Sequence, residues 1–126
     1  MRYLLLHCVD ESREFSSEHA AQIDASTASW TEQTTRDGTG LHGAFLRPAR
    51  EARTVRVRGS EVLVTDGPFA ETREQIGGYD VIECESLDEA LAVAGAHPVA
   101  QIGTVEVRPI LGSRPAARDV SRNRMR

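Results

Sequence analysis

The order of its strand and helix patterns is the feature that most constrains how this chain can fold. Two stretches with helical periodicity lie between apolar or alternating stretches that are typical of strands, and a further pair of strands has the pattern of a hairpin. The predicted elements are a strand Arg2–Val9, a helix from Ser16 or Ser17 to Asp37, a strand Leu41–Leu46, a hairpin Thr54–Arg58 and Glu61–Thr65, a strand Gly78–Cys84, a helix from Ser86, and a strand Thr104–Ile110.

This order is that of two split βαβ units. It predicts an α+β fold, namely a ferredoxin-like sandwich with an inserted β-hairpin. Residues at the ends of the predicted elements agree with this fold. Asp37-Gly38 ends the first helix, Gly59-Ser60 suits a two-residue hairpin turn, and Ser86 with Glu89 forms a capping box.

Two helices can cover only one face of such a sheet. We expect Tyr3, Leu5, Val105 and Val107 on the other face, which would then be too apolar to remain in water. The sequence therefore predicts a homodimer that buries this face.

Composition excludes several classes of protein. The chain has 126 residues, enough for one domain, and no apolar run approaches the roughly 20 residues of a membrane span. Its start reads as a strand and not as a signal peptide, so a cytoplasmic location is expected. All fifteen basic residues are arginine, which excludes a Schiff-base lysine and the lysine of a Walker-type phosphate loop.

The potential metal ligands are scattered. None of the cysteines and histidines has zinc-site spacing, so neither a metal nor a cofactor is predicted, and both cysteines are expected to be reduced. These residues are Cys8, Cys84, His7, His19, His42 and His97. His97, before Pro98, is interpreted as a helix-terminal histidine.

Charge divides the chain in two. Residues 1–111 hold ten arginines and eighteen acidic residues (−8), whereas residues 112–126 hold five arginines and Asp119 (+4), which gives the net charge of −4. The acidic part argues against nucleic acid as a main partner. We assign 1–111 to the folded domain, and the basic stretch 112–126 is expected to be disordered, with weak docking to an acidic surface as its functional interpretation.

The segment between the hairpin and the next strand is dense in special residues. Asp66-Gly67 suits a turn, Phe69 is expected to insert into the core, and residues 69–75 are expected to form a short helix. The functional interpretation makes this segment a site, and the structural one makes it a turn, a hydrophobic plug and a solvated helix face. The full segment is Asp66-Gly67-Pro68-Phe69-Ala70-Glu71-Thr72-Arg73-Glu74-Gln75-Ile76-Gly77-Gly78-Tyr79.

That segment resembles the signature of the YCII-related, or DGPF-domain, family. The start Met1–Leu6, the helix start Ser86–Ala90 and the last strand Val105–Pro109 match as well. The resemblance implies a dimeric α+β barrel. Most members of that family are uncharacterised, some are encoded beside extracytoplasmic-function sigma factors, and one related domain serves in dehydrochlorination of a hydroxyquinol.

The resemblance also implies an acid/base His–Asp pair, with the histidine on the first helix. Here the corresponding position falls near Thr27, so the pair is broken unless His7 or His42 reaches in from a strand. Arg73 stands where the family usually has lysine.

The leading functional hypothesis is a homodimer that binds a small anionic or aromatic molecule in a cleft lined by Asp66, Glu71, Tyr79 and Arg108. Asp66 would be the general base and Arg108 the anchor. Glu106 shares a sheet face with Arg108, as an ion pair or as part of the site. Further candidate binding residues are Arg73 and Glu74, and the structural part of the motif is Gly67, Pro68, Phe69, Gly77 and Gly78. The alternatives are a non-enzymatic accessory partner, such as of a sigma factor, and a motif that serves only folding.

Overall fold

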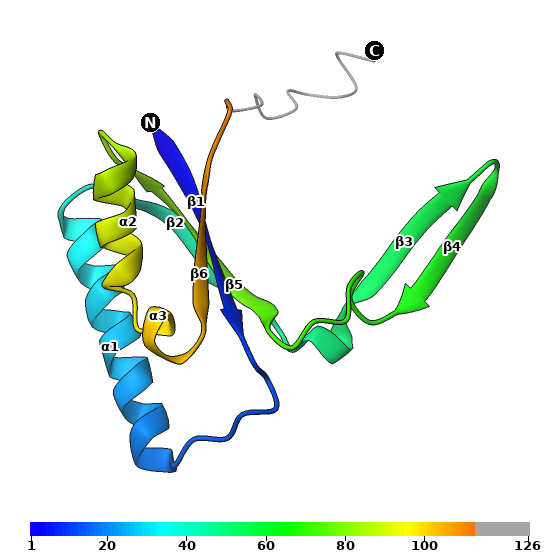
Figure 1. Ribbon diagram of the computed structural model, residues 1–126, viewed down its shortest axis with the longest axis horizontal. Coiled ribbons are helices and arrows are strands. Elements are labelled where there is room, and N and C mark those ends of the chain that lie inside the picture. Colours follow the sequence, from blue (N-terminus) through cyan, green and yellow to red (C-terminus); the bar gives the residue numbers. More distant parts are fainter. Residues whose placement is uncertain (113–126) are drawn as a thin grey trace, which may run out of the picture.

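The computed structural model describes residues 1–112, and its centre is a four-stranded antiparallel sheet (Figure 1). The strand order is β2-β5-β1-β6, so β1 lies inside the sheet between β5 and β6. The strands of this sheet are β1 (Arg2–Val9), β2 (Gly40–Phe45), β5 (Gln75–Glu83) and β6 (Thr104–Pro109). The predicted α+β, ferredoxin-like fold with an inserted hairpin is confirmed.

Three helices lie on one side of the sheet (Figure 1). They are α1 (Ser17–Arg36), α2 (Leu87–Gly95) and the short α3 (Val99–Ile102). Ser16 and Ser86 cap α1 and α2, because their hydroxyl oxygens accept the backbone N–H groups of His19 and Glu89. No helix within residues 1–112 is long and apolar enough to cross a membrane.

The core lies between the helices and the sheet. Leu5 and Ile82 are fully buried, and Trp30 of α1 donates its indole N–H to the carbonyl oxygen of Val93 at 2.9 Å, which joins α1 to α2. The buried apolar residues are Tyr3, Leu5, Trp30, Ile82, Cys84, Ala90 and Ala94. Cys8 and Cys84 are both free, as expected.

The predicted assignment of residues to the two sheet faces was wrong. Tyr3 and Leu5 are buried beneath the helices, and Val105 and Val107 pack against the same core. Because Tyr3 to Leu6 are apolar at every position, their pattern does not indicate which alternate set faces the helices. The uncovered face instead carries the other set, which includes Leu4 and, across the register, Val81.

The inserted hairpin stands away from the body as a two-stranded arm (Figure 1). It consists of β3 (Arg53–Arg58) and β4 (Glu61–Asp66), and a short 3-10 helix, η1 (Ala49–Glu51), leads into it. Gly59 has a φ of 63° at the hairpin turn, as a tight two-residue loop requires.

The connection from the arm to β5 differs from the prediction in two ways. Residues 67–74 form no helix, and Gln75 already begins β5, where it pairs with Val9. Phe69 is 77% exposed and not in the core; its ring lies under the Arg56 guanidinium at 5.0 Å. Gly67, at a φ of 94°, and Pro68 turn the chain there, and too few residues remain before β5 for a stable helix.

The predicted basic tail lies, apart from Gly112, outside the described residues.

Candidate functional site

A pocket of about 510 Å³ lies on the helix-covered side of the sheet. Its walls come from β1, β2, β5, α1 and the segment around α3, together with the loop that joins β1 to α1. The lining is mainly apolar and includes the aromatic rings of Phe15 and Phe45. This size and polarity are those of sites for small organic molecules.

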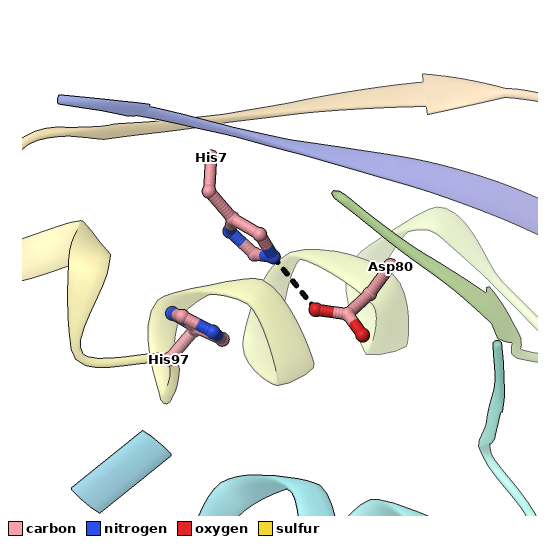
Figure 2. Close-up of side chains that lie close together, drawn as sticks. All are labelled: His7, Asp80 and His97. Atoms are coloured by element: carbon pink, nitrogen blue, oxygen red, sulfur yellow. Dashed lines mark hydrogen bonds and ion pairs between the residues drawn. The ribbon is translucent and has the colours of Figure 1, made fainter. Parts of the chain in front are cut away.

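A His–Asp pair lines this pocket. His7 on β1 and Asp80 on β5 project from neighbouring strands, and His7 Nε2 lies 2.7 Å from Asp80 Oδ2 (Figure 2). The His7 side chain is 7% exposed and that of Asp80 is 22% exposed, so Asp80 is the more accessible member. His7 Nδ1 is buried and has no hydrogen-bond partner among the described residues.

His97 completes a cluster of three rings. Its imidazole stacks on that of His7, with ring centres 4.0 Å apart and an interplanar angle of 20°, and the Trp30 ring meets it edge-on at 4.7 Å. His97 Nδ1 accepts the backbone N–H of Val99 at 3.1 Å. Burial, followed by the nearby His7, lowers the pKa of His97 to about 4, against an opposing effect of Asp80.

This low pKa predicts a loss of stability in mild acid. The unfolded chain, with an ordinary histidine pKa near 6.5, binds more protons than the folded chain between about pH 6.5 and 4. The contribution of neutral His97 is therefore complete above pH 6.5 and declines towards pH 4, by roughly 2–3 kcal/mol. Urea unfolding of His97→Gln across this range should show a flatter pH dependence than the parent protein. The matched control, His19→Gln on the exposed surface of α1, should keep the parent's dependence; equal slopes in all three proteins would contradict the prediction.

Gly43 makes room for the carboxyl group of Asp80. It is the β2 partner of Asp80, and a Cβ atom at this position would overlap Asp80 Oδ1 and lie 2.9 Å from the carbonyl oxygen of Tyr79. Asp80 can therefore hold its position beside His7 only because residue 43 has no side chain.

The side chains of His7, Asp80 and His97 lie close enough together to raise the question of whether they bind a metal ion. One ligand atom from each of His7, Asp80 and His97 lies within 4.8 Å of the others. The two imidazole planes are nearly parallel, however, so their nitrogen lone pairs do not converge on one point, and His97 Nδ1 is already engaged by Val99. The geometry fits a hydrogen-bonded acid/base pair better than a metal centre.

The pocket is lined by more acidic than basic side chains. Asp10, Glu11 and Asp24 line it, whereas Arg13 is the single basic lining residue and lies over the Phe15 ring at 4.9 Å. Hydrogen bonds from the hydroxyl and backbone N–H of Ser12, with a smaller contribution from Arg73, lower the pKa of Asp10 and keep it ionised.

The structure brings only part of the predicted site to this pocket. Gly77, Gly78 and Tyr79 line it, although the Tyr79 hydroxyl is hydrogen-bonded to His42 Nδ1 at 2.9 Å. Arg73 reaches its rim, with Nε 3.4 Å from Asp10 Oδ2.

The other predicted site residues lie elsewhere. Asp66 is at the end of the arm strand β4, paired with Arg53 at 3.1 Å, and its side chain is 88% exposed. Glu106 and Arg108 form an exposed ion pair on β6, 3.6 Å apart. Glu71, Glu74, Pro68 and Phe69 belong to the segment after Gly67 and do not line the pocket.

Asp80 and the role of His97 were missed by sequence reasoning. Of the two histidines proposed to replace the missing helix residue, His7 is the one that meets an aspartate. The signal for Asp80 was a carboxylate inside an otherwise apolar strand, between Tyr79 and Val81. Thr27, at the position expected for the helix histidine, does line the same pocket.

Comparison with known proteins identifies the family of this chain. The model of the YCII-related domain family matches residues 1–114. An uncharacterized protein, R00369, of Rhizobium meliloti (strain 1021) is 46% identical over 76 residues, which are 57% of this chain and 60% of that protein. The match thus spans about three fifths of that curated relative.

A solved structure shares the fold. It is the 5-chloro-2-hydroxyhydroquinone dehydrochlorinase TftG of Burkholderia phenoliruptrix AC1100, in complex with 2,5-dihydroxybenzoquinone. The superposition has a TM-score of 0.51 at 15% identity and covers 90% of this chain and 96% of that one. The family match over residues 1–114, which include every described residue, establishes that the chain belongs to the YCII-related domain family.

Proposed function

We propose that the pocket binds a small hydroxylated aromatic molecule and that the His7–Asp80 pair moves a proton on it. The observation that carries this proposal is the 2.7 Å contact between the two side chains at the wall of a mainly apolar pocket. A histidine and a carboxylate in hydrogen-bond contact are the usual components of general acid–base catalysis.

The rim and the lining favour an uncharged ring over an anion. Four carboxylates and one guanidinium line the pocket, so a strongly anionic ligand would be repelled. The apolar walls and the rings of Phe15 and Phe45 offer contacts to a flat ring. The solved relative of the same fold holds a dihydroxybenzoquinone, which supports this substrate class.

Asp80 is the group that would meet the bound molecule. Its Oδ2 atom contacts His7, while Oδ1 lies over Gly43 on the pocket wall. Asp80 would accept the proton of a ligand hydroxyl, leaving an aryl oxide, and the His7 Nε2–H group would hold the carboxyl in place by donating to Oδ2. A phenol deprotonated in this way is activated for loss or rearrangement of a ring substituent.

Binding and turnover of a panel of phenols, catechols and hydroquinones test the proposal. Amide shifts in NMR spectra should locate bound compounds at the pocket, and ultraviolet absorbance should follow their conversion. Asp80→Asn should lower turnover by at least about 100-fold, because a proton acceptor is removed with little change of shape. The matched control is Asp66→Asn, which changes a carboxylate on the arm and should leave turnover unchanged.

Two results would contradict this function. Failure of every compound to shift the pocket amides would reject the substrate class. Equal turnover by Asp80→Asn and the parent protein would reject the acid/base role.

A further inference from the structure

Hydrogen bonding orients the His7 ring through only one of its two nitrogens. Nε2 lies 2.7 Å from Asp80 Oδ2, whereas Nδ1 is buried and meets no hydrogen-bond partner within residues 1–112. A histidine in acid–base chemistry is commonly oriented by a hydrogen bond at its second nitrogen. The terminal torsion of a histidine side chain has only broad preferences, so the bond to Asp80 by itself leaves the ring free to tilt. A different contact is therefore needed to fix the plane of the His7 ring.

The ring of His97 lies against that plane. His97 belongs to the link between α2 and α3, and its imidazole stacks on that of His7 with ring centres 4.0 Å apart and 20° between the planes (Figure 2). Both residues are buried. A tilt of the His7 ring would press it into the His97 face on one side and open a gap on the other, and a close-packed interior resists both changes. The stack thus supplies the restraint that Nδ1 does not.

His97 is itself held from several directions. Its backbone N–H donates to the carbonyl oxygen of Ala94 at 3.1 Å, and its carbonyl oxygen accepts the N–H of Ala100 at 3.0 Å. Its side-chain Nδ1 accepts the backbone N–H of Val99 at 3.1 Å, and the buried Trp30 ring meets it edge-on at 4.7 Å. These contacts give the His97 ring one orientation, which it can impose on His7.

The stack also suits an uncharged His97 ring. Nδ1 of His97 accepts the Val99 N–H through its lone pair, so this nitrogen carries no proton. The low pKa of His97 agrees with a neutral ring. An uncharged His97 does not compete with the His7 N–H for the negative charge of Asp80.

We infer that His97 is a positioning residue that fixes the plane of the His7 ring, so that Nε2–H points at Asp80. The His97 ring holds His7, and His7 holds the carboxyl group that would accept the proton of a ligand. The effect of His97 on turnover rests on the function proposed above. Its effect on the orientation of His7 rests on contacts within the protein alone.

NMR of the histidine ring protons tests this inference without a ligand. Near neutral pH the buried His7 Nε2–H should exchange slowly with water and give a resolved signal, which His7→Gln removes. His97→Phe keeps a flat ring against His7 and should keep this signal. His97→Leu is equally apolar but has no flat ring, and should lose it. Both variants lack the acceptor of the Val99 N–H, so the difference between them isolates the stack.

Turnover of the panel of phenols is the second measurement. His97→Leu should lower kcat by about 10-fold or more at an unchanged KM, because a misplaced His7 weakens an interaction made in the transition state. His97→Phe should stay within about 3-fold of the parent protein. A residue that only supports the fold would lower the stability of both variants but leave the His7 signal and kcat of the folded proteins unchanged.

The NMR result decides the inference independently of the proposed function. A parent protein without the His7 signal, a signal retained in both His97 variants or a signal lost in both would each overturn it. If circular dichroism shows that His97→Leu is unfolded, His97→Gln, which also lacks a ring, replaces it with the same expectation. Absence of phenol turnover, with the signal lost only in the variants without a ring, would reject the acid–base function and leave the positioning role of His97 intact.

Discussion

Trp30→Ala should lower the free energy of unfolding by about 3–5 kcal/mol, the range for a buried aromatic residue. Trp30 is 7% exposed and supplies most of the buried volume of α1, whose other buried residue is Thr34. Its removal leaves a cavity and also leaves the carbonyl oxygen of Val93 without the indole donor. Chemical denaturation followed by circular dichroism measures the change.

The variant Trp30→Phe separates the contribution of side-chain volume to stability from that of the hydrogen bond. Trp30→Phe keeps a ring against His97 but loses the N–H donor, and should cost about 1–3 kcal/mol. Water that enters the Trp30→Ala cavity should also raise the pKa of His97 towards its ordinary value, which NMR titration follows. A loss below about 1 kcal/mol in Trp30→Ala would show that α1 is held to the sheet by other contacts.

Gly43→Ala should cost up to about 3 kcal/mol and remove the function of the pocket, although it adds a single methyl group. The new Cβ would overlap Asp80 Oδ1, and the strand backbone at Tyr79 leaves little room to move. Asp80 must therefore turn away from His7, which breaks the 2.7 Å contact. Chemical denaturation of Gly43→Ala measures the loss of stability. The turnover assay proposed above for Asp80→Asn, applied to Gly43→Ala, measures the loss of function.

A double-mutant cycle checks that the clash with Asp80 is the cause. In an Asp80→Ala background the overlapping oxygen is absent, so the stability cost of Gly43→Ala should fall by about 1–2 kcal/mol. An equal cost in both backgrounds would locate the strain in the backbone and not in the carboxyl group.

Most of the fold could be predicted from local patterns. The caps at Ser16 and Ser86, the glycine after Asp37 and the alternation in the hairpin act within a few residues, so the sequence displays them directly. The errors concern contacts between residues that are far apart in the chain. Phe69 looked like a core residue because it is large and apolar, but its place beside Arg56 on the outside follows from where the arm leaves the body.

The candidate site could be predicted only in outline. Of the residues singled out from the sequence, Gly77 and Gly78 of the structural motif and the candidate binding residue Tyr79 border the pocket. The choice of Asp66 as general base followed the density of special residues around it, whereas Asp80 sits inconspicuously in a strand. His97 was interpreted from its neighbour Pro98, and nothing near it in the chain indicates a stack on His7.

The sequence by itself determined the order of the main elements, the caps of the two long helices and the family. These follow from hydrogen bonding and side-chain periodicity between residues close in the chain. Only the tertiary structure decided which face of β1 is buried and which groups meet in the pocket. His7 and Asp80 are 73 residues apart, and the register of β1 against β5 brings them into contact. In a strand that is apolar on both faces, that register depends on the packing of the whole sheet against its helices.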